Sequence, residues 1–128
     1  MNEFILLVRN DIDHHAVLSS EQHQHFITKC EDYIDNLTKE GKLKSAQPLA
    51  GRGKLISGLK EAWKEEPFNE NKEFIVGCYH IFAEALNDAL IIAKGNPEFE
   101  YATTARIEIR PIMMRRESTG YFYHQAPN

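Results

Sequence analysis

The sequence lacks both a long apolar segment and an excess of basic residues. No apolar run approaches the roughly 18 residues that a helix needs to cross a bilayer. The opening MNEFILLVRND has a short apolar run with no basic segment before it, unlike a signal peptide. The net charge is −4, whereas nucleic-acid binding needs a basic surface that displaces counterions from phosphates. We therefore expect a cytoplasmic protein that binds neither membranes nor nucleic acids.

The residue patterns that mark covalent or nucleotide chemistry are also scarce. No serine lies in the Gly-x-Ser-x-Gly turn of hydrolases. The segment Gly51-Arg52-Gly53 lacks the rest of a phosphate-binding or dinucleotide-binding fingerprint. Cys30 and Cys78 form no metal-type pair, and we interpret them as buried, reduced thiols. The sequence therefore predicts no cofactor and no covalent catalysis.

Four histidines lie within a short stretch and raise the question of a metal site: His14, His15, His23 and His25. Helical neighbours two positions apart point to different sides, so His23 and His25 cannot share one ion. A pairing of His14 or His15 with His23 stays open, with Asp11 and Asp13 near them in the sequence. No known spacing of metal ligands is met, and we expect no bound metal.

The rest of the chain shows the hydrophobic periodicity of one α+β domain. Its 128 residues, 42% hydrophobic and 27% charged, suffice for a single core without disulfide bonds. Residues 1–114 should form this domain, and residues 115–128 should form a C-terminal tail. The best-defined helix begins after Ser19 or Ser20, with Gln22 placed for a capping box, and ends before Gly41. The other expected elements are strands at 3–9, 43–49, 54–60, 73–82 and 103–112 and a helix at 83–95.

The order of these elements predicts the fold class. Strands 43–49 and 54–60 should form a hairpin through the glycine-containing turn 50–53, with Pro48 favouring an edge position. One strand, a helix, three strands, a helix and a last strand are typical of a ferredoxin-like α+β fold, an antiparallel sheet with two helices on one face. The second helix should bury Phe82, Leu86, Ala89, Leu90 and Ala93.

Several short segments of the chain resemble the DGPF branch of the YCII-related proteins. They are EEPFNENKE at 65–73, GCYHI at 77–81, LNDALIIAK at 86–94, the pair at 96–97 and IEIRPI at 107–112. The resemblance runs from the first strand to Ile112. It implies that two ferredoxin-like sheets pack face to face as a homodimeric α+β barrel. The roles of family members are mostly unassigned, so the resemblance implies a fold more than an activity.

The chain departs from the motif of that branch just before Pro67. Glu65 and Glu66 stand where the branch has Asp-Gly. Glutamate disfavours the positive φ that glycine permits, but it accepts the extended conformation required before proline. Phe68 then has two interpretations: an apolar anchor that holds the polar loop 64–73 to the body, or a substrate-binding residue on a lid that closes over a cleft.

The last strand carries the most informative candidates for a site. Its alternation places Arg106, Glu108 and Arg110 on one side and the apolar residues on the other. The charged side faces either solvent or, in the resembled dimer, a polar cavity or interface. Residues 108–111 resemble the Glu-Val-Arg-Pro of the branch, which favours the cavity. There Arg110 would bind a substrate carboxylate through its planar fork, and Glu108 would be a catalytic residue.

Three further residues are candidates for the same site. Arg9 ends the first strand and would bind substrate together with Arg110. His80 is either a core or interface histidine or a proton carrier, since histidine changes protonation near neutral pH. Other YCII-type proteins are thought to use a His-Asp pair with the histidine near the start of the first helix. His23 is the best positional match for that histidine, and a packed helix-end histidine is its alternative.

Two classes of function remain open from the sequence. The first is a small homodimeric proton-transfer enzyme, isomerase-like or lyase-like, that acts on a small organic acid or cyclic metabolite. His80 or His23 would move the proton, and Arg110 or Arg9 would hold an oxygen of the substrate. The alternative is a non-catalytic small-molecule-binding or accessory dimerisation module that uses the same cavity or the dimer face.

Overall fold

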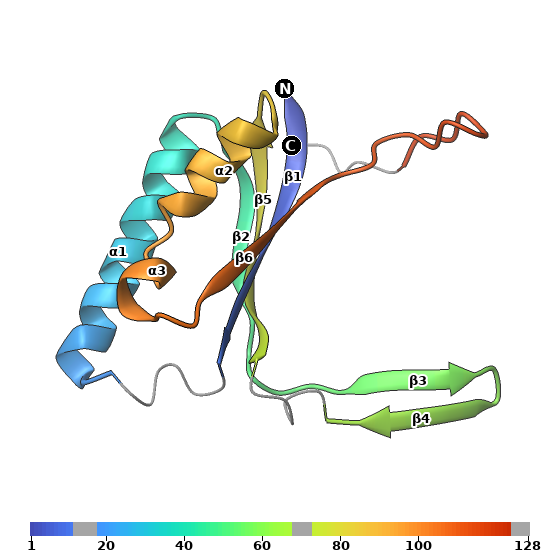
Figure 1. Cartoon of the computed structure of the whole chain (residues 1–128), viewed down its shortest axis with the longest axis horizontal. Helices are drawn as coiled ribbons and strands as arrows, with labels where there is room; N and C mark the ends of the chain where they lie inside the picture. The colour runs from blue at the N-terminus through green and yellow to red at the C-terminus, as the bar shows by residue number, and fades with distance from the viewer. Residues whose placement is uncertain (12–17, 68–72, 124–128) are drawn as a thin grey trace.

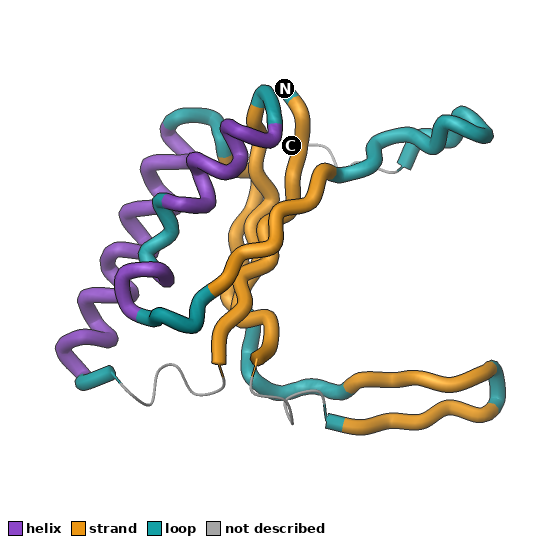
Figure 2. The backbone as a smooth tube through the Cα atoms, in the orientation of Figure 1, coloured by secondary structure: helices purple, strands orange, loops and turns teal. Residues whose placement is uncertain are grey.

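The computed structural model describes residues 1–11, 18–67 and 73–123. In chain order the elements are β1 (Asn2–Asp11), α1 (Ser20–Lys39), β2 (Leu43–Pro48), β3 (Leu55–Leu59), β4 (Ala62–Glu66), β5 (Glu73–Ala83), α2 (Leu86–Lys94), α3 (Glu98–Tyr101) and β6 (Arg106–Pro111). Four strands form an antiparallel sheet in the order β2-β5-β1-β6. All three helices lie on one face of this sheet (Figure 1 and Figure 2). The expected ferredoxin-like α+β fold is confirmed, with the single turn α3 as an addition.

Helix α1 begins and ends where its sequence predicts. Ser19 caps the helix by accepting a hydrogen bond from the Gln22 amide at 3.1 Å, while the Gln22 side chain accepts one from the Ser19 amide at 2.9 Å. At the other end Gly41 has a φ of 71°, a conformation in which glycine is favoured because it has no Cβ. The Lys42 amide then bonds back to the Leu37 carbonyl, which completes a Schellman motif.

The hydrophobic core lies between the sheet and the helices. From Phe4 to Asn10 strand β1 alternates, with its even-numbered residues buried beneath the helices and its odd-numbered residues turned to the other face. Leu6 and Ile81, at the centre of the sheet, are fully buried. Each such side chain contributes about 1.5–3 kcal/mol through the apolar surface it removes from water. The members of the core are Phe4, Leu6, Val8, Leu37, Tyr79, Ile81, Ala83, Ala89, Ile92 and Ala93.

The pairing expected for strands 43–49 and 54–60 is wrong. β2 pairs with β5, at the edge of the sheet where Pro48 ends it, while β3 pairs with β4. Strand β4 lies in a stretch partly assigned to the polar loop 64–73. The hairpin turn is Lys60-Glu61, in which Glu61 adopts a φ of 69°. Neither residue belongs to the types that favour such a turn, so the sequence did not indicate it.

The buried face expected for the second helix is also wrong in part. α2 begins only at Leu86, which is half exposed, and Phe82 remains within β5. The residues that α2 buries are Ala89, Ile92 and Ala93. The helix starts three residues later than expected; Ala89 and Ala93 are buried as predicted, and Ile92 is buried although it was not expected. No helix in the described part of the chain is long and apolar enough to cross a membrane.

Candidate functional site

Four of the six candidate site residues lie on the face of the sheet that no described helix covers (Figure 1). Arg9 alternates with the buried Val8 and Asn10 on β1. His80 lies between the buried Tyr79 and Ile81 on β5. Glu108 and Arg110 alternate with Ile107 and Ile109, which pack against the core. We call this surface the uncovered face; it brings Glu108 and Arg110 of β6 together with Arg9.

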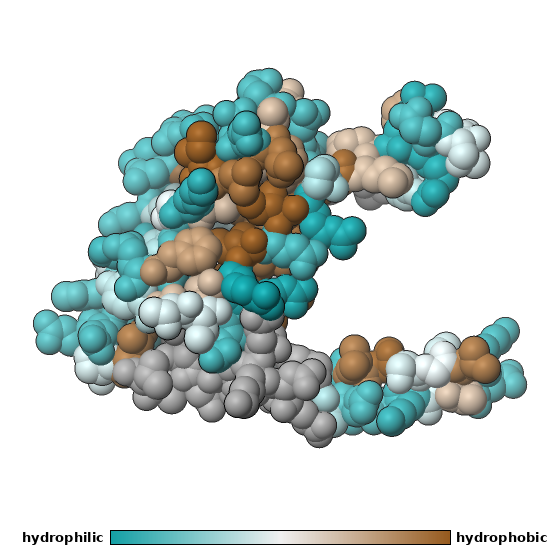
Figure 3. All heavy atoms as spheres, viewed as in Figure 1, coloured by the Kyte–Doolittle hydropathy of each residue, from teal (hydrophilic) through white to brown (hydrophobic). Residues whose placement is uncertain are grey.

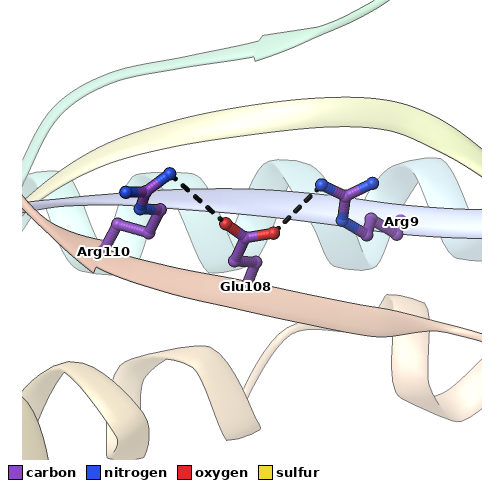
Figure 4. A network of polar contacts seen from close by, with 3 residues as sticks. All are labelled: Arg9, Glu108 and Arg110. Atoms are coloured by element: carbon purple, nitrogen blue, oxygen red, sulfur yellow. Dashed lines mark hydrogen bonds and ion pairs between the residues drawn. The ribbon is translucent and has the colours of Figure 1, made fainter.

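Arg9, Glu108 and Arg110 form a chain of ion pairs on the uncovered face (Figure 4). Arg9 Nη2 lies 3.0 Å from Glu108 Oε1, and Arg110 Nη1 lies 3.8 Å from Glu108 Oε2. The Arg110 side chain is 70% exposed, whereas those of Arg9 and Glu108 are 32% and 39% exposed. Pairs this exposed contribute at most about 1 kcal/mol each. A substrate carboxylate at Arg9 would have to displace Glu108.

A second charged cluster lies toward the other end of the uncovered face. His80 Nε2 is 2.6 Å from Glu3 Oε1, and Lys44 Nζ is 4.0 Å from the same oxygen. Both the His80 and the Glu3 side chains are less than one-fifth exposed. Glu3 was not among the expected site residues, although the alternation of β1 puts it on the same face as Arg9. His80 is thus held by a neighbouring carboxylate and lies on the opposite side of the sheet from His23.

A cavity of about 540 Å³ lies on the helical side of the sheet, between α1 and strands β1, β2 and β5. Its volume is in the range typical of small-ligand sites, roughly 300–1,000 Å³. The apolar lining includes Val8, Phe26, Ile27, Ile34 and Val76, and the polar lining includes Asp11, His23, Cys30, Glu31, Gln47, Tyr79, Asn96 and Glu98. Apolar walls with a few convergent polar groups are the usual composition of a binding site.

The start of α1 holds His23 in this cavity. His23 belongs to the first turn of the helix, and its amide bonds to the Ser19 carbonyl at 2.8 Å. The capping box that fixes Ser19 and Gln22 therefore also fixes the backbone from which His23 projects. Among the candidates expected from the sequence and described by the structure, His23 alone lines the cavity. His25, two residues further, is exposed.

A buried polar network supports the part of the cavity lining that Asn96 and Glu98 form. Asn10 is fully buried, and its Nδ2 donates a hydrogen bond to Glu98 Oε1 at 2.6 Å. Its Oδ1 accepts hydrogen bonds from the Thr104 hydroxyl at 2.7 Å and from the Asp11 amide at 2.8 Å. The Glu98 amide in turn donates to Asn96 Oδ1 at 2.9 Å. These bonds satisfy groups that would be costly to bury alone, and they fix the Glu98 carboxylate where it lines the cavity.

The lining of the cavity is acidic. Asp11, Glu31 and Glu98 contribute to it, and no lysine or arginine does so among the described lining residues. Burial, together with the charges of Glu98, Glu100 and Glu31, raises the pKa of the Cys30 thiol from 9.0 to about 11. The thiol therefore stays protonated at neutral pH and is a poor nucleophile.

Two tyrosines beside the cavity are also held in their neutral form. Burial raises the pKa of Tyr79 from 10.0 to about 12, although the nearby Asn96 amide opposes this in part. Burial likewise raises the pKa of Tyr33, whose hydroxyl donates to the Ile92 carbonyl at 2.6 Å. At neutral pH the Tyr79 hydroxyl can therefore donate a hydrogen bond in the cavity but cannot act as a base. His23 is then the histidine of the lining, a residue type often used as a general acid or base.

A comparison with protein families decides which group the chain belongs to. A family model of the YCII-related domain matches residues 3–113. The chain belongs to the YCII-related family. A comparison with curated proteins finds none that matches it. The match spans both surfaces described above, so the uncovered face and the cavity are both parts of this YCII-related domain.

The structure places the remaining candidates of this YCII-related domain as follows. Phe68 and residues 69–72 of the loop 64–73 lie outside the described residues. No group of three or more histidine, cysteine, aspartate or glutamate side chains that could hold a metal ion occurs within residues 1–11, 18–67 and 73–123. The sequence interpretation missed Asn10, Asn96 and Glu98. A polar residue at a buried position of β1 was the one signal that could have revealed Asn10, since such groups are retained only with partners.

Proposed function

We propose that this YCII-related protein is a proton-transfer enzyme, isomerase-like or lyase-like, whose site is the cavity between α1 and the sheet. The observation that carries the proposal is the placement of His23 in a mostly apolar cavity lined also by Asp11 and Glu98. Low polarity around an acid-base group strengthens its interaction with a bound substrate. The resemblance to other YCII-type proteins implies a His-Asp pair, and Asp11, the aspartate among the described lining residues, is its candidate partner for His23.

The charge of the lining narrows the substrate class. Three carboxylates and no described cationic side chain line the cavity, so an anionic substrate would be repelled. Of the two classes expected from the sequence, we therefore favour a small cyclic metabolite without formal charge over an organic acid. His23 would take a proton from a carbon or hydroxyl group of the ring and return it elsewhere. The Tyr79 hydroxyl would donate a hydrogen bond to the oxygen on which negative charge develops.

A binding screen coupled to isotope exchange tests this function. Neutral cyclic ketones, enols and phenols are screened beside carboxylic acids by thermal shift, since a ligand at 100 times its Kd adds about 2.7 kcal/mol of stability, roughly 2–8 °C. Each hit is then incubated in D₂O, and proton exchange at carbon is followed by NMR. We expect exchange with the wild type and with His25→Gln, the control on the exposed side of the same helix. We expect about 10²–10⁴-fold slower exchange with His23→Gln.

The same screen separates the enzyme from the non-catalytic alternative. A hit that binds in the cavity but shows no enzyme-dependent exchange would favour a small-molecule-binding module. Equal exchange rates for His23→Gln and the wild type would contradict the role of His23. Hits confined to carboxylic acids that are lost in Arg110→Ala would instead move the site to the uncovered face.

The proposal includes a homodimer formed through the uncovered face, in keeping with the α+β barrel of the DGPF branch. Ile5 and Leu7 lie at the centre of that face between the two charged clusters, and Phe82 lies beside His80. Packing two such faces together would cover apolar side chains that no described helix covers. We place the dimer in the cytoplasm, where two free thiols such as Cys30 and Cys78 stay reduced.

A further inference from the structure

The hairpin of β3 and β4 projects from the body of the protein as an arm (Figure 1 and Figure 2). We define the arm as residues 54–66. It carries four large apolar side chains that are 51–80% exposed: Leu55, Ile56, Leu59 and Trp63. Within the described part of the chain, β3 and β4 have extensive contacts with each other and with no other helix or strand. An isolated two-stranded ribbon is at best marginally stable in water, so the arm lacks the cover that its apolar residues require.

Both sides of the arm are partly apolar. In the register of the hairpin Leu59 lies opposite Ala62, and Gly58 lies opposite Trp63. Leu55 and Leu59 therefore share one side of the ribbon, and Ile56 and Trp63 share the other. A Cβ at Gly58 would lie 2.3 Å from the Ala62 carbonyl oxygen, so a glycine is needed for the strands to approach closely there. The result is a thin ribbon that can be covered from either side.

The direction of the arm indicates what covers it. The arm and the segment after β6 both leave the body on the side of the uncovered face, and the space-filling view shows apolar surface along the arm (Figure 1 and Figure 3). A molecule seated on the uncovered face would therefore meet the arm as well. That face carries acidic and basic groups around an apolar centre, as a self-complementary contact of two identical faces requires.

We propose that the arm packs against a second copy of this chain, beside the contact between the two uncovered faces. This inference rests on the homodimer in the proposed function but not on its chemistry. A stable interface uses roughly 20–30 residues on each side, and the uncovered face together with residues 54–66 provides a surface of that order.

The length of the arm fixes how far it reaches. The leading segment together with β3, residues 49–59, spans roughly 30 Å when extended, whereas two sheets packed face to face lie about 10 Å apart. The tip of the arm therefore passes the sheet of the second copy and lies along its flank. The segment that leads into the arm starts at the cavity, because Pro48, Leu49 and Gly51 line it. Docking of the arm on a second copy thus fixes one rim of the cavity in the first.

The protein contains one tryptophan, Trp63, which makes the arm directly observable. The full chain is diluted stepwise while its mass is followed by sedimentation and its tryptophan emission by fluorescence. We expect a dimer whose emission shifts to longer wavelength as it dissociates, because Trp63 moves from a packed to a hydrated environment. In Leu59→Lys or Ile56→Lys, one on each side of the ribbon, we expect the dissociation constant to rise about a hundredfold or more, since a two-fold dimer loses the contact twice.

Ile91→Lys is the matched control. Ile91 is 68% exposed, as the arm residues are, but it lies on α2 in the helical layer, and its substitution should leave dissociation unchanged. A dimer whose Kd is unaffected by both arm variants, with exposed tryptophan emission, would overturn the role of the arm and leave the homodimer intact. A monomer at all concentrations would overturn both. A monomer in which Trp63 emits at the short wavelength of a buried tryptophan would show that the arm folds back on its own chain, which would also overturn the proposal. None of these outcomes depends on the activity of His23.

Discussion

The buried pair of Asn10 and Glu98 permits a prediction of both size and sign. Asn10→Asp is nearly isosteric, but it replaces the amide that donates to Glu98 at 2.6 Å with a second carboxylate. Both residues are at least nine-tenths buried, so water screens the new contact poorly. The substitution should therefore cost stability mainly through electrostatics and leave the packing of the core intact.

The cost can be estimated in two ways that agree. Two ionised carboxylates with charge centres about 4 Å apart repel by about 4 kcal/mol at an effective dielectric constant of about 20. The pair can avoid this repulsion by holding one proton. Keeping a proton at pH 7 on a group whose ordinary pKa is near 4 costs about 1.4 kcal/mol per pH unit, again about 4 kcal/mol. The expected loss of stability at pH 7 is therefore about 4 kcal/mol.

The pH dependence follows from that proton. The folded variant binds one proton more than its unfolded chain above about pH 4, so its stability rises as the pH falls from 7 toward 4. Urea denaturation at pH 5 and pH 7, referenced to the wild type at each pH, should show the loss shrinking by about 1.4 kcal/mol per pH unit. Thr104→Val, which removes one neutral hydrogen bond to Asn10, should cost about 1 kcal/mol at both pH values. A loss for Asn10→Asp that is below about 1 kcal/mol, or equal at both pH values, would refute the reasoning.

Three further predictions concern stability. Since the pKa of Cys30 is raised from 9.0 to about 11, the folded state keeps a proton that the unfolded chain loses, so stability falls as the pH rises from 9 to 11. Cys30→Ala should reduce this fall by about 1 kcal/mol, allowing for partial exposure of the thiol, and an equal fall in both proteins by urea denaturation would contradict it. Ser19→Ala removes the capping box of α1 and should cost about 1 kcal/mol; an unchanged urea midpoint would speak against that role. Ile81→Ala should cost about 2–5 kcal/mol and Ile91→Ala less than about 0.5 kcal/mol, since one is fully buried and the other 68% exposed; similar losses in thermal unfolding would contradict the assignment of the core.

The parts of the fold that the sequence predicted are those decided by local chemistry. The bounds of α1 follow from a side chain that caps its start and a glycine that adopts positive φ at its end. The two sides of β6 follow from strict alternation, since one side must face the core. The pairing of β2 with β5 could not be predicted in the same way, because strands far apart in the chain are brought together by tertiary packing. The arm was missed because its strands bury no side against the body.

For the candidate site, the sequence predicted which residues share one side of a strand or a helix, but not how these sides are placed relative to each other. Alternation placed Glu108 and Arg110 on one side of β6, and helical periodicity placed His23 on the inner stripe of α1. Neither pattern states that these surfaces lie on opposite faces of the same sheet, because that depends on which face the helices cover. The role of Glu98 in the cavity lining was missed because Asn96 and Pro97 indicated the end of α2, and no further helix was expected after them. The short helix α3, which positions Glu98, follows Pro97 directly.

The most direct test of the proposed site is where a bound ligand sits. A stabilising hit from the neutral cyclic panel is titrated into isotope-labelled protein, and the shifted amide and methyl resonances are assigned. We expect the shifts to cluster at Phe26, Ile34, Val76 and Asn96, which line the cavity around His23. Shifts that cluster instead at Ile5, Cys78 and Arg110 would place the ligand on the uncovered face and contradict the cavity as the site.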